Sequence, residues 1–268
     1  MDIRSLAIHG GANGDPYTGA VTVPIYQTST YAQENIGQHK GFEYSRTGNP
    51  TREVLEKLIA ELEEGYRGFA FGSGMAAIAS VLMLLKSGDH ILVSDDVYGG
   101  TFRVIDKVFK NFDLEYDFIN TSDTAKVRDS IKDNTKMIYI ETPTNPLMKL
   151  TPIRAIAEIA KEKGILTVVD NTFATPYLQR PITQGADIVL HSATKYLGGH
   201  SDLVAGLVVV NNEELGNRMH FIQNAVGAIL GPFDSWLLIK GIRTLPIRMD
   251  RHCENAEQIV GWLSKQSW

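Results

Sequence analysis

The 268-residue sequence contains a single cysteine, Cys253, so an internal disulfide is excluded and we expect a protein of the reducing cytoplasm. Basic residues are no more common than acidic ones, and the net charge of -5 argues against nucleic acid or an anionic membrane as partner. The start, Met1-Asp2-Ile3-Arg4, lacks the basic and then apolar run of a signal peptide. No apolar run approaches the roughly 20 residues of a membrane span, which predicts a soluble protein with no membrane partner.

The sequence does contain a regular alternation of apolar runs with helix-like stretches. The expected strands are 69–71, 91–93, 114–119, 137–140, 167–169, 188–190 and 203–210. Such alternation is typical of an α/β fold, in which helices cover a largely parallel sheet.

Three regions follow from these patterns. Residues 1–50 carry scattered glycine, proline and threonine, as an extended N-terminal arm would. Residues 51–244 form the expected α/β domain, which begins with a helix whose apolar face is Leu55, Leu58, Ile59 and Leu62 and whose expected stop is Gly65. Residues 245–268 show a helical pattern that leads out of this domain.

A lysine at a strand end is the first candidate for chemistry. Lys195 follows the apolar run 186–190 and is preceded by Ser192 and Thr194, two hydroxyl donors. Burial at the mouth of a strand favours the unprotonated amine that Schiff-base chemistry requires. A solvated strand-end lysine is the simpler interpretation, and three further segments argue against it.

An acid at a second strand end is the first of these segments. Asp170 closes the run 166–169, at the carboxyl end of an expected parallel strand, where open α/β sheets bind ligands. An aspartate that only caps the following turn is the alternative. Beside a Schiff-base lysine, an aspartate that keeps a pyridine nitrogen protonated would make pyridoxal phosphate an electron sink.

The other two segments predict an anion site and a stacking ring. Small residues from Gly72 to Ala77 open a helix-like stretch that reaches Leu85, and their backbone N–H groups could hold a phosphate. The same residues spell the G-x-G-x-x-A of a dinucleotide fold, so an oxidoreductase is an alternative. Tyr98 follows another strand, where its ring could stack on a flat cofactor.

With these segments in view, the whole chain resembles the pyridoxal-phosphate enzymes of cysteine and methionine metabolism, most closely the cystathionine γ-lyase and γ-synthase group. The resemblance rests on six motifs in order: Tyr44-Ser45-Arg46-Thr47-Gly48-Asn49-Pro50-Thr51, Gly74-Met75-Ala76-Ala77, Val97-Tyr98-Gly99-Gly100-Thr101, Glu141-Thr142-Pro143-Thr144-Asn145-Pro146, Asp170-Asn171-Thr172 and Ser192-Ala193-Thr194-Lys195. It implies a fold-type I transferase-like domain with a mostly parallel seven-stranded sheet. Family members continue with a smaller C-terminal α/β domain, which we expect to be largely absent from this sequence.

The resemblance also implies roles for individual residues. Lys195 would bind the cofactor covalently and shuttle protons, Asp170 would face the pyridine nitrogen, and Tyr98 would stack on the ring and help to deprotonate the substrate amine. The remaining implied cofactor-binding residues are Gly74, Met75, Ser192 and Thr194 at the phosphate, Thr172, Asn145 beside the substrate carboxylate, and Tyr44 and Arg46, which would reach the cofactor of a neighbouring subunit. No metal site is predicted.

The implied activity is carbon–sulfur lyase chemistry on a small sulfur-containing amino acid, by a homodimer or a dimer of dimers in the cytoplasm. Elimination at the γ-carbon would convert cystathionine to cysteine, 2-oxobutyrate and ammonia. A γ-synthase and a β-lyase remain alternatives, and methionine γ-lyases rank lower because they tend to have cysteine at the position of Gly100. Ser192-Ala193-Thr194-Lys195 also spells the S-x-x-K of penicillin-binding enzymes, but the accompanying motifs are missing. An inactive, truncated cofactor-binding or scaffold form is the non-enzymatic alternative.

Overall fold

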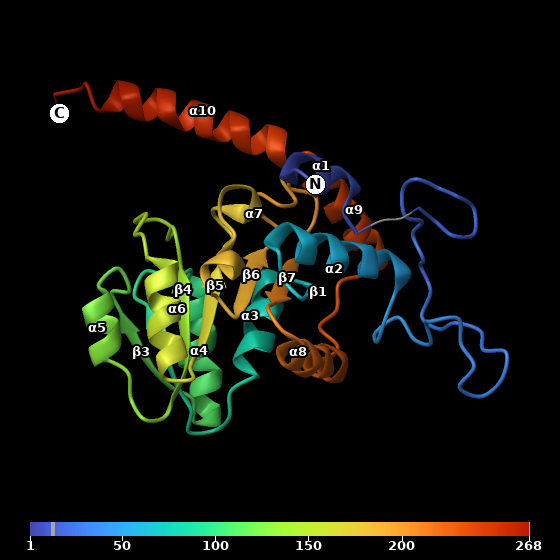
Figure 1. Ribbon diagram of the computed structural model, residues 1–268, viewed down its shortest axis with the longest axis horizontal. Coiled ribbons are helices and arrows are strands. Elements are labelled where there is room, and N and C mark those ends of the chain that lie inside the picture. The colour runs from blue at the N-terminus through green and yellow to red at the C-terminus, as the bar shows by residue number, and fades with distance from the viewer. Residues whose placement is uncertain (12–13, 268) are drawn as a thin grey trace.

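The computed structural model describes residues 1–11 and 14–267, and the strands of these residues form one seven-stranded sheet (Figure 1). The strands are β1 (Arg67–Phe71), β2 (His90–Ser94), β3 (Glu115–Ile119), β4 (Thr135–Glu141), β5 (Leu166–Asp170), β6 (Ile188–Ser192) and β7 (Gly206–Val210). Their spatial order is β1-β7-β6-β5-β4-β2-β3. All neighbours from β6 to β3 are parallel, and β7 runs antiparallel to both β1 and β6. The predicted α/β class with a mostly parallel seven-stranded sheet is confirmed.

Helices precede, connect and follow these strands. The α-helices are α1 (Ile3–His9), α2 (Pro50–Glu63), α3 (Gly74–Leu82), α4 (Gly99–Lys107), α5 (Thr124–Asp129), α6 (Ile153–Glu162), α7 (Thr175–Leu178), α8 (Glu213–Val226), α9 (Pro232–Arg243) and α10 (Leu245–Leu263), and two 3₁₀ turns are η1 (Phe109–Phe112) and η2 (Pro181–Gln184). Within the described ranges, no helix combines the length and apolar character needed to cross a lipid bilayer.

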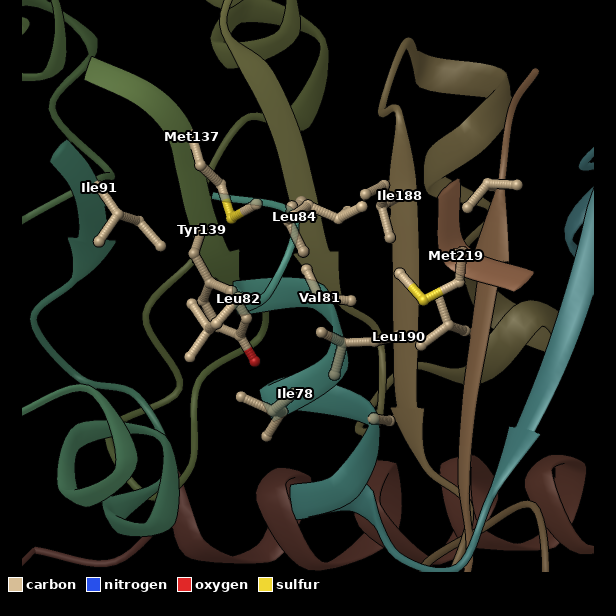
Figure 2. Close-up of a cluster of buried hydrophobic side chains, with 14 of the residues drawn as sticks. Ile78, Val81, Leu82, Leu84, Ile91, Met137, Tyr139, Ile188, Leu190 and Met219 are labelled. Carbon is tan, nitrogen blue, oxygen red and sulfur yellow. The ribbon is translucent and has the colours of Figure 1, made fainter. Parts of the chain in front are cut away.

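The two faces of the sheet carry separate apolar layers because side chains alternate along each strand. In β4, Tyr139 points into the layer beneath α3, whereas Ile138 and Ile140 pack on the opposite side with α6. Figure 2 shows Ile78 and neighbouring side chains of α3 against the strands of this first layer. This packing fixes α3 across the sheet and places its N-terminus at the carboxyl ends of the strands.

Helix α2 covers the other face near β1 and β7. Its four predicted apolar residues, Leu55, Leu58, Ile59 and Leu62, are all buried. The helix ends at Glu64, which takes the left-handed conformation with φ of 58°, rather than at the predicted Gly65. A side chain at Gly65 would overlap Val209, so close packing on β7 explains this glycine.

Three local predictions were wrong. The expected strand 203–210 begins only at Gly206, because the Ala205 N–H donates to the Thr194 hydroxyl (3.1 Å) rather than to a strand. The helix expected to reach Leu85 ends at Leu82, after which the N–H groups of residues 84 and 85 bond three residues back in a tighter turn. The expected arm contains α1, whose buried Ala7 packs with the apolar residues of α2.

Candidate active site

The register of the strands brings their carboxyl ends to one edge of the sheet. Phe71 of β1 and Ser192 of β6 both lie opposite Gly206 of β7. Glu141 of β4 lies opposite Asp170 of β5 in the neighbouring parallel pair. The residues that follow β1, β4, β5 and β6 therefore meet at this edge, as the sequence predicted for its candidate sites.

Asp170 is a buried acid at this edge, 5% exposed. Its Oδ2 accepts a hydrogen bond from the Tyr139 hydroxyl (3.1 Å), and its Oδ1 accepts one from the Thr172 N–H (3.1 Å). Burial raises the pKa of Asp170, and the hydrogen bonds from Thr172 oppose this shift. Among the described residues, no lysine, arginine or histidine forms an ion pair with Asp170. The carboxylate is therefore prepared for a cationic ligand, which would offset the cost of its burial.

Glu141 is a second buried acid at the same edge, and the sequence analysis gave it no role. Its Oε2 accepts from the Tyr98 N–H (2.8 Å) and its Oε1 accepts from the Asn145 N–H (3.2 Å). Burial, followed by repulsion from Asp170, raises the pKa of Glu141 to about 8. Its position at the end of a strand, like that of Asp170, was a signal that could have identified it.

The N-terminus of α3 forms a cradle with Ser192. Ser73 caps the helix through its Oγ, which accepts from the Ala76 N–H (3.0 Å). The N–H groups of Gly74 and Met75 precede the first intrahelical hydrogen bond, so they are available to an anion. A methyl group built on Gly74 would lie 2.8 Å from Cβ of Ser192 and 2.9 Å from its Oγ. Glycine at this position lets the helix end and the serine hydroxyl approach the same point.

Tyr98 lies at the start of α4, and its ring borders this cradle. A methyl group built on Gly100 would overlap the Tyr98 ring and lie 2.7 Å from Sδ of Met75. Tyr98 is half exposed, so it is accessible to a ligand. The structure thus brings the predicted stacking ring next to the predicted phosphate site.

Lys195 follows β6 in a turn in which its N–H donates to the Ser192 carbonyl (3.2 Å). The predicted burial of this lysine was wrong, since Lys195 is exposed beyond the end of the strand. Thr194 is engaged by the backbone, because its hydroxyl donates to the Ala205 carbonyl (3.3 Å). Thr172 joins two predicted site segments, since its Oγ1 accepts from the Ser192 N–H (2.8 Å).

A buried polar network lies behind these segments and was not anticipated. Glu63 of α2 accepts through Oε1 from Nδ2 of Asn171 (2.9 Å), and the same oxygen lies 2.8 Å from Nε2 of His191. Glu63 and His191 are fully buried. Because Asn171 follows Asp170 and His191 precedes Ser192, the network fixes the two strand ends that carry the candidate residues.

Tyr44 and Arg46 lie elsewhere on the surface. The Arg46 guanidinium stacks on the Tyr44 ring at 5.3 Å, and its Nε donates to Oδ1 of Asn224 in α8 (3.3 Å). No hydrogen bond or ion pair between described residues joins this pair to Lys195 or Asp170. Asn145 is exposed and reaches the edge through its backbone contact with Glu141.

These residues fit the parts of pyridoxal phosphate. The start of α3 and Ser192 match a phosphate, and the buried Asp170, which has no cationic partner among the described residues, matches a protonated ring nitrogen. The half-exposed side chain of Tyr98 matches a flat ring, and the exposed Lys195 is accessible to an aldehyde.

The comparisons with known proteins agree with this fit. The cystathionine γ-lyase of Bacillus subtilis (strain 168) is 59% identical over 263 residues, which span 98% of this chain and 69% of that protein. A cystathionine β-lyase of Lactococcus lactis subsp. cremoris (strain MG1363) is 58% identical over 97% of this chain and 69% of its own. Relatives named as γ-synthases match as well.

The solved structures give the same relationship. The crystal structure of cystathionine γ-lyase from Lactobacillus plantarum complexed with L-serine superposes with a TM-score of 0.98 and 52% identity, over 100% of this chain and 70% of that chain. The family described as Cys/Met metabolism PLP-dependent enzyme matches residues 4–268. A match of this extent, together with a site that suits the cofactor, establishes that the chain belongs to this family of pyridoxal-phosphate-dependent enzymes.

Proposed function

We propose that this protein is a pyridoxal-phosphate-dependent carbon–sulfur lyase that cleaves cystathionine at the γ-carbon. With water, cystathionine would give cysteine, 2-oxobutyrate and ammonia. The observation that carries the proposal is the buried Asp170, which lacks a cationic partner among the described residues and lies on the same sheet edge as the α3 cradle and the Lys195 turn. Family membership supports the same chemistry.

The proposed cofactor contacts follow from this geometry. Asp170 would bind the ring nitrogen, with Thr172 holding its carboxylate in place. The proposed phosphate ligands are the N–H groups of Gly74 and Met75 and the hydroxyls of Ser192 and Thr194. To bind a phosphate, the Thr194 hydroxyl must share or exchange its present hydrogen bond to the Ala205 carbonyl.

The reacting groups are proposed to be Lys195 and Tyr98. When bound, pyridoxal phosphate stabilises negative charge at the substrate α-carbon. The Nζ of Lys195 would hold the cofactor until substrate binds, and would then move the proton from the substrate α-carbon. The Tyr98 side chain, as its phenolate, would accept a proton from the substrate amine, and the Asn145 side chain would bind near the substrate carboxylate. The exposure of Lys195 leaves its Nζ free to move between these positions.

The choice of γ-elimination rests on two features. The B. subtilis relative bears the name cystathionine γ-lyase. A methyl group built on Gly100 overlaps the Tyr98 ring, so the cysteine typical of methionine γ-lyases would require the ring to move. A cystathionine β-lyase and a γ-synthase remain the alternative activities, since relatives with these names are nearly as similar.

Product analysis separates these activities. The purified protein, loaded with pyridoxal phosphate and supplied with cystathionine, should release 2-oxobutyrate and cysteine. Pyruvate and homocysteine would identify a β-lyase instead. Turnover only when cysteine and an O-acylated homoserine are supplied together would identify a γ-synthase.

Lys195→Ala tests the covalent attachment. Borohydride reduction of the loaded wild-type protein should fix the cofactor to the peptide that contains Lys195, as measured by mass spectrometry, and the variant should have no adduct and no elimination activity. Lys240→Ala, an exposed lysine of α9, is the matched control and should behave like the wild type. An adduct that persists at another lysine of the Lys195→Ala protein would contradict the assignment.

A further inference from the structure

One side chain joins three parts of the candidate site. The two carboxylate oxygens of Glu141 accept from the N–H groups of Tyr98 (2.8 Å) and Asn145 (3.2 Å), which belong to loops after β2 and β4. Its position in β4 is opposite Asp170 in β5. Glu141 is 6% exposed, so the contacts are made away from bulk water.

We propose that Glu141 is a positioning residue, which holds the Tyr98 and Asn145 loops beside the cofactor and is linked to cofactor binding through Asp170. This inference rests on the proposed function, because it concerns the same site. A carboxylate is suited to the task, since it accepts on both oxygens and each bond from a backbone N–H is charge-assisted. An amide in its place could accept only on one side.

The charges around Glu141 explain how its protonation is linked to cofactor binding. The acids that face it are Asp170 of β5 and Asp96 of the loop after β2, and the neutral Tyr139 hydroxyl lies near both strand ends. In the described part of the chain, no basic side chain forms an ion pair with Glu141. Burial and the repulsion from Asp170 therefore raise the pKa of Glu141 to about 8, so the group is mainly protonated near pH 7.

A cation at Asp170 would reverse this balance. It would offset the negative charge of Asp170 and so lower the pKa of Glu141, which favours the ionised form that binds the two N–H groups more strongly. Binding of a ligand with a cationic ring nitrogen should release a proton from Glu141 and tighten the two loops. Ligand binding at the ring-nitrogen site and ordering of the two loops would thus occur together.

The test compares Glu141→Gln with the wild type in the cofactor-free protein. Calorimetric titration with pyridoxal phosphate at pH 7, in two buffers of different ionisation enthalpy, counts the protons released. The wild type should release more protons per site than the variant, at most about one, because the protons of the cofactor itself are common to both. The variant should also bind the cofactor roughly tenfold more weakly, as expected for loss of one charge-assisted hydrogen bond.

Hydrogen exchange gives a second readout that needs no cofactor. At pH 9, above the raised pKa of Glu141, the amide of Tyr98 should exchange roughly tenfold faster in Glu141→Gln if one N–H bond is lost. Glu162→Gln, an exposed glutamate of α6 paired with Arg128 (2.7 Å), is the matched control and should match the wild type in both measurements.

The outcomes separate this proposal from the proposed function. Equal proton release and equal amide exchange in Glu141→Gln and wild type, with normal cofactor binding, would overturn the role of Glu141 and leave the lyase proposal intact. Failure of the wild type to bind pyridoxal phosphate would overturn the lyase proposal and, with it, the linkage.

Discussion

At the scale of single residues, Asp170 links chemistry to stability. Burial raises the pKa of Asp170, so the protonated carboxyl favours the folded state. In the cofactor-free protein, this contribution to the free energy of unfolding is present at low pH and is lost as the pH rises through the pKa of the folded state. Asp170→Asn removes the carboxylate charge, and the amide can still form hydrogen bonds with the Tyr139 hydroxyl and the Thr172 N–H. The free energy of unfolding of the cofactor-free variant should therefore fall less than that of the wild type between pH 5 and 9, as measured by urea denaturation.

The same substitution should damage catalysis. A neutral amide cannot keep a ring nitrogen protonated, so turnover of the loaded Asp170→Asn protein should fall by roughly a hundredfold or more. Asp133→Asn, at an exposed turn before β4, should change neither property. Near-normal turnover in Asp170→Asn would contradict its role at the ring nitrogen.

The residues of the candidate site differ in how far they could be predicted from the sequence. Asp170 and Ser192 could be predicted because each closes an apolar strand of a parallel sheet, and such ends share one edge. Glu141 also closes a strand, but its contacts come from two loops that fold back onto it. Likewise, the exposure of Lys195 depends on the turn that follows β6, which the apolar run does not define.

At the scale of elements, the buried pair of Glu63 and His191 joins α2 to β6. Glu63→Ala would leave Nε2 of His191 without its partner and remove one of the two acceptors of Asn171, and we expect it to lower the free energy of unfolding by about 3–5 kcal/mol. Glu53→Ala is the control in the same helix, because its ion pair with Lys57 is solvent-exposed and should contribute less than about 1 kcal/mol. Urea denaturation followed by tryptophan fluorescence measures the free energy of unfolding of both variants. Equal losses would show that the buried pair contributes no more to stability than the exposed pair.

The boundaries of elements show why part of the fold could not be predicted. The buried face of α2 follows from helical periodicity, which is local information. The start of β7 depends on the Thr194 hydroxyl, which accepts from the Ala205 N–H across 11 residues of sequence. Helix α1 is only seven residues long, too short for a periodic signal, and depends on packing against α2.

At the scale of the whole molecule, the family resemblance implies that Tyr44 and Arg46 complete the site of a neighbouring subunit, and among the described residues no hydrogen bond or ion pair joins them to Asp170 or Lys195. Arg46→Ala and Lys195→Ala proteins should each be inactive. Unfolding and refolding them together in equal amounts should restore about a quarter of the wild-type elimination rate. Half of randomly formed dimers are hybrids, and one of the two sites in each hybrid is intact.

Mixing each variant with itself is the control for that experiment. If hybrid dimers form, as shown by affinity tags on the two chains, and no activity returns, the site must be made within one chain. The arm would then have a role other than the one that the family resemblance implies.

The position of β7 between β1 and β6 has a consequence for synthesis on the ribosome. In the sheet of the described residues, the strand neighbour of β1 is β7, which begins about 135 residues after β1 ends, and Phe71 of β1 also bridges Ile229. At roughly 5–20 residues per second, β7 is synthesised on the order of ten seconds after β1. Ribosome-bound chains that stop before Gly206 should remain open to protease at β1, whereas chains in which β7 has emerged should be protected. The cradle at the start of α3, which follows β1, is therefore expected to form only after β7 has emerged.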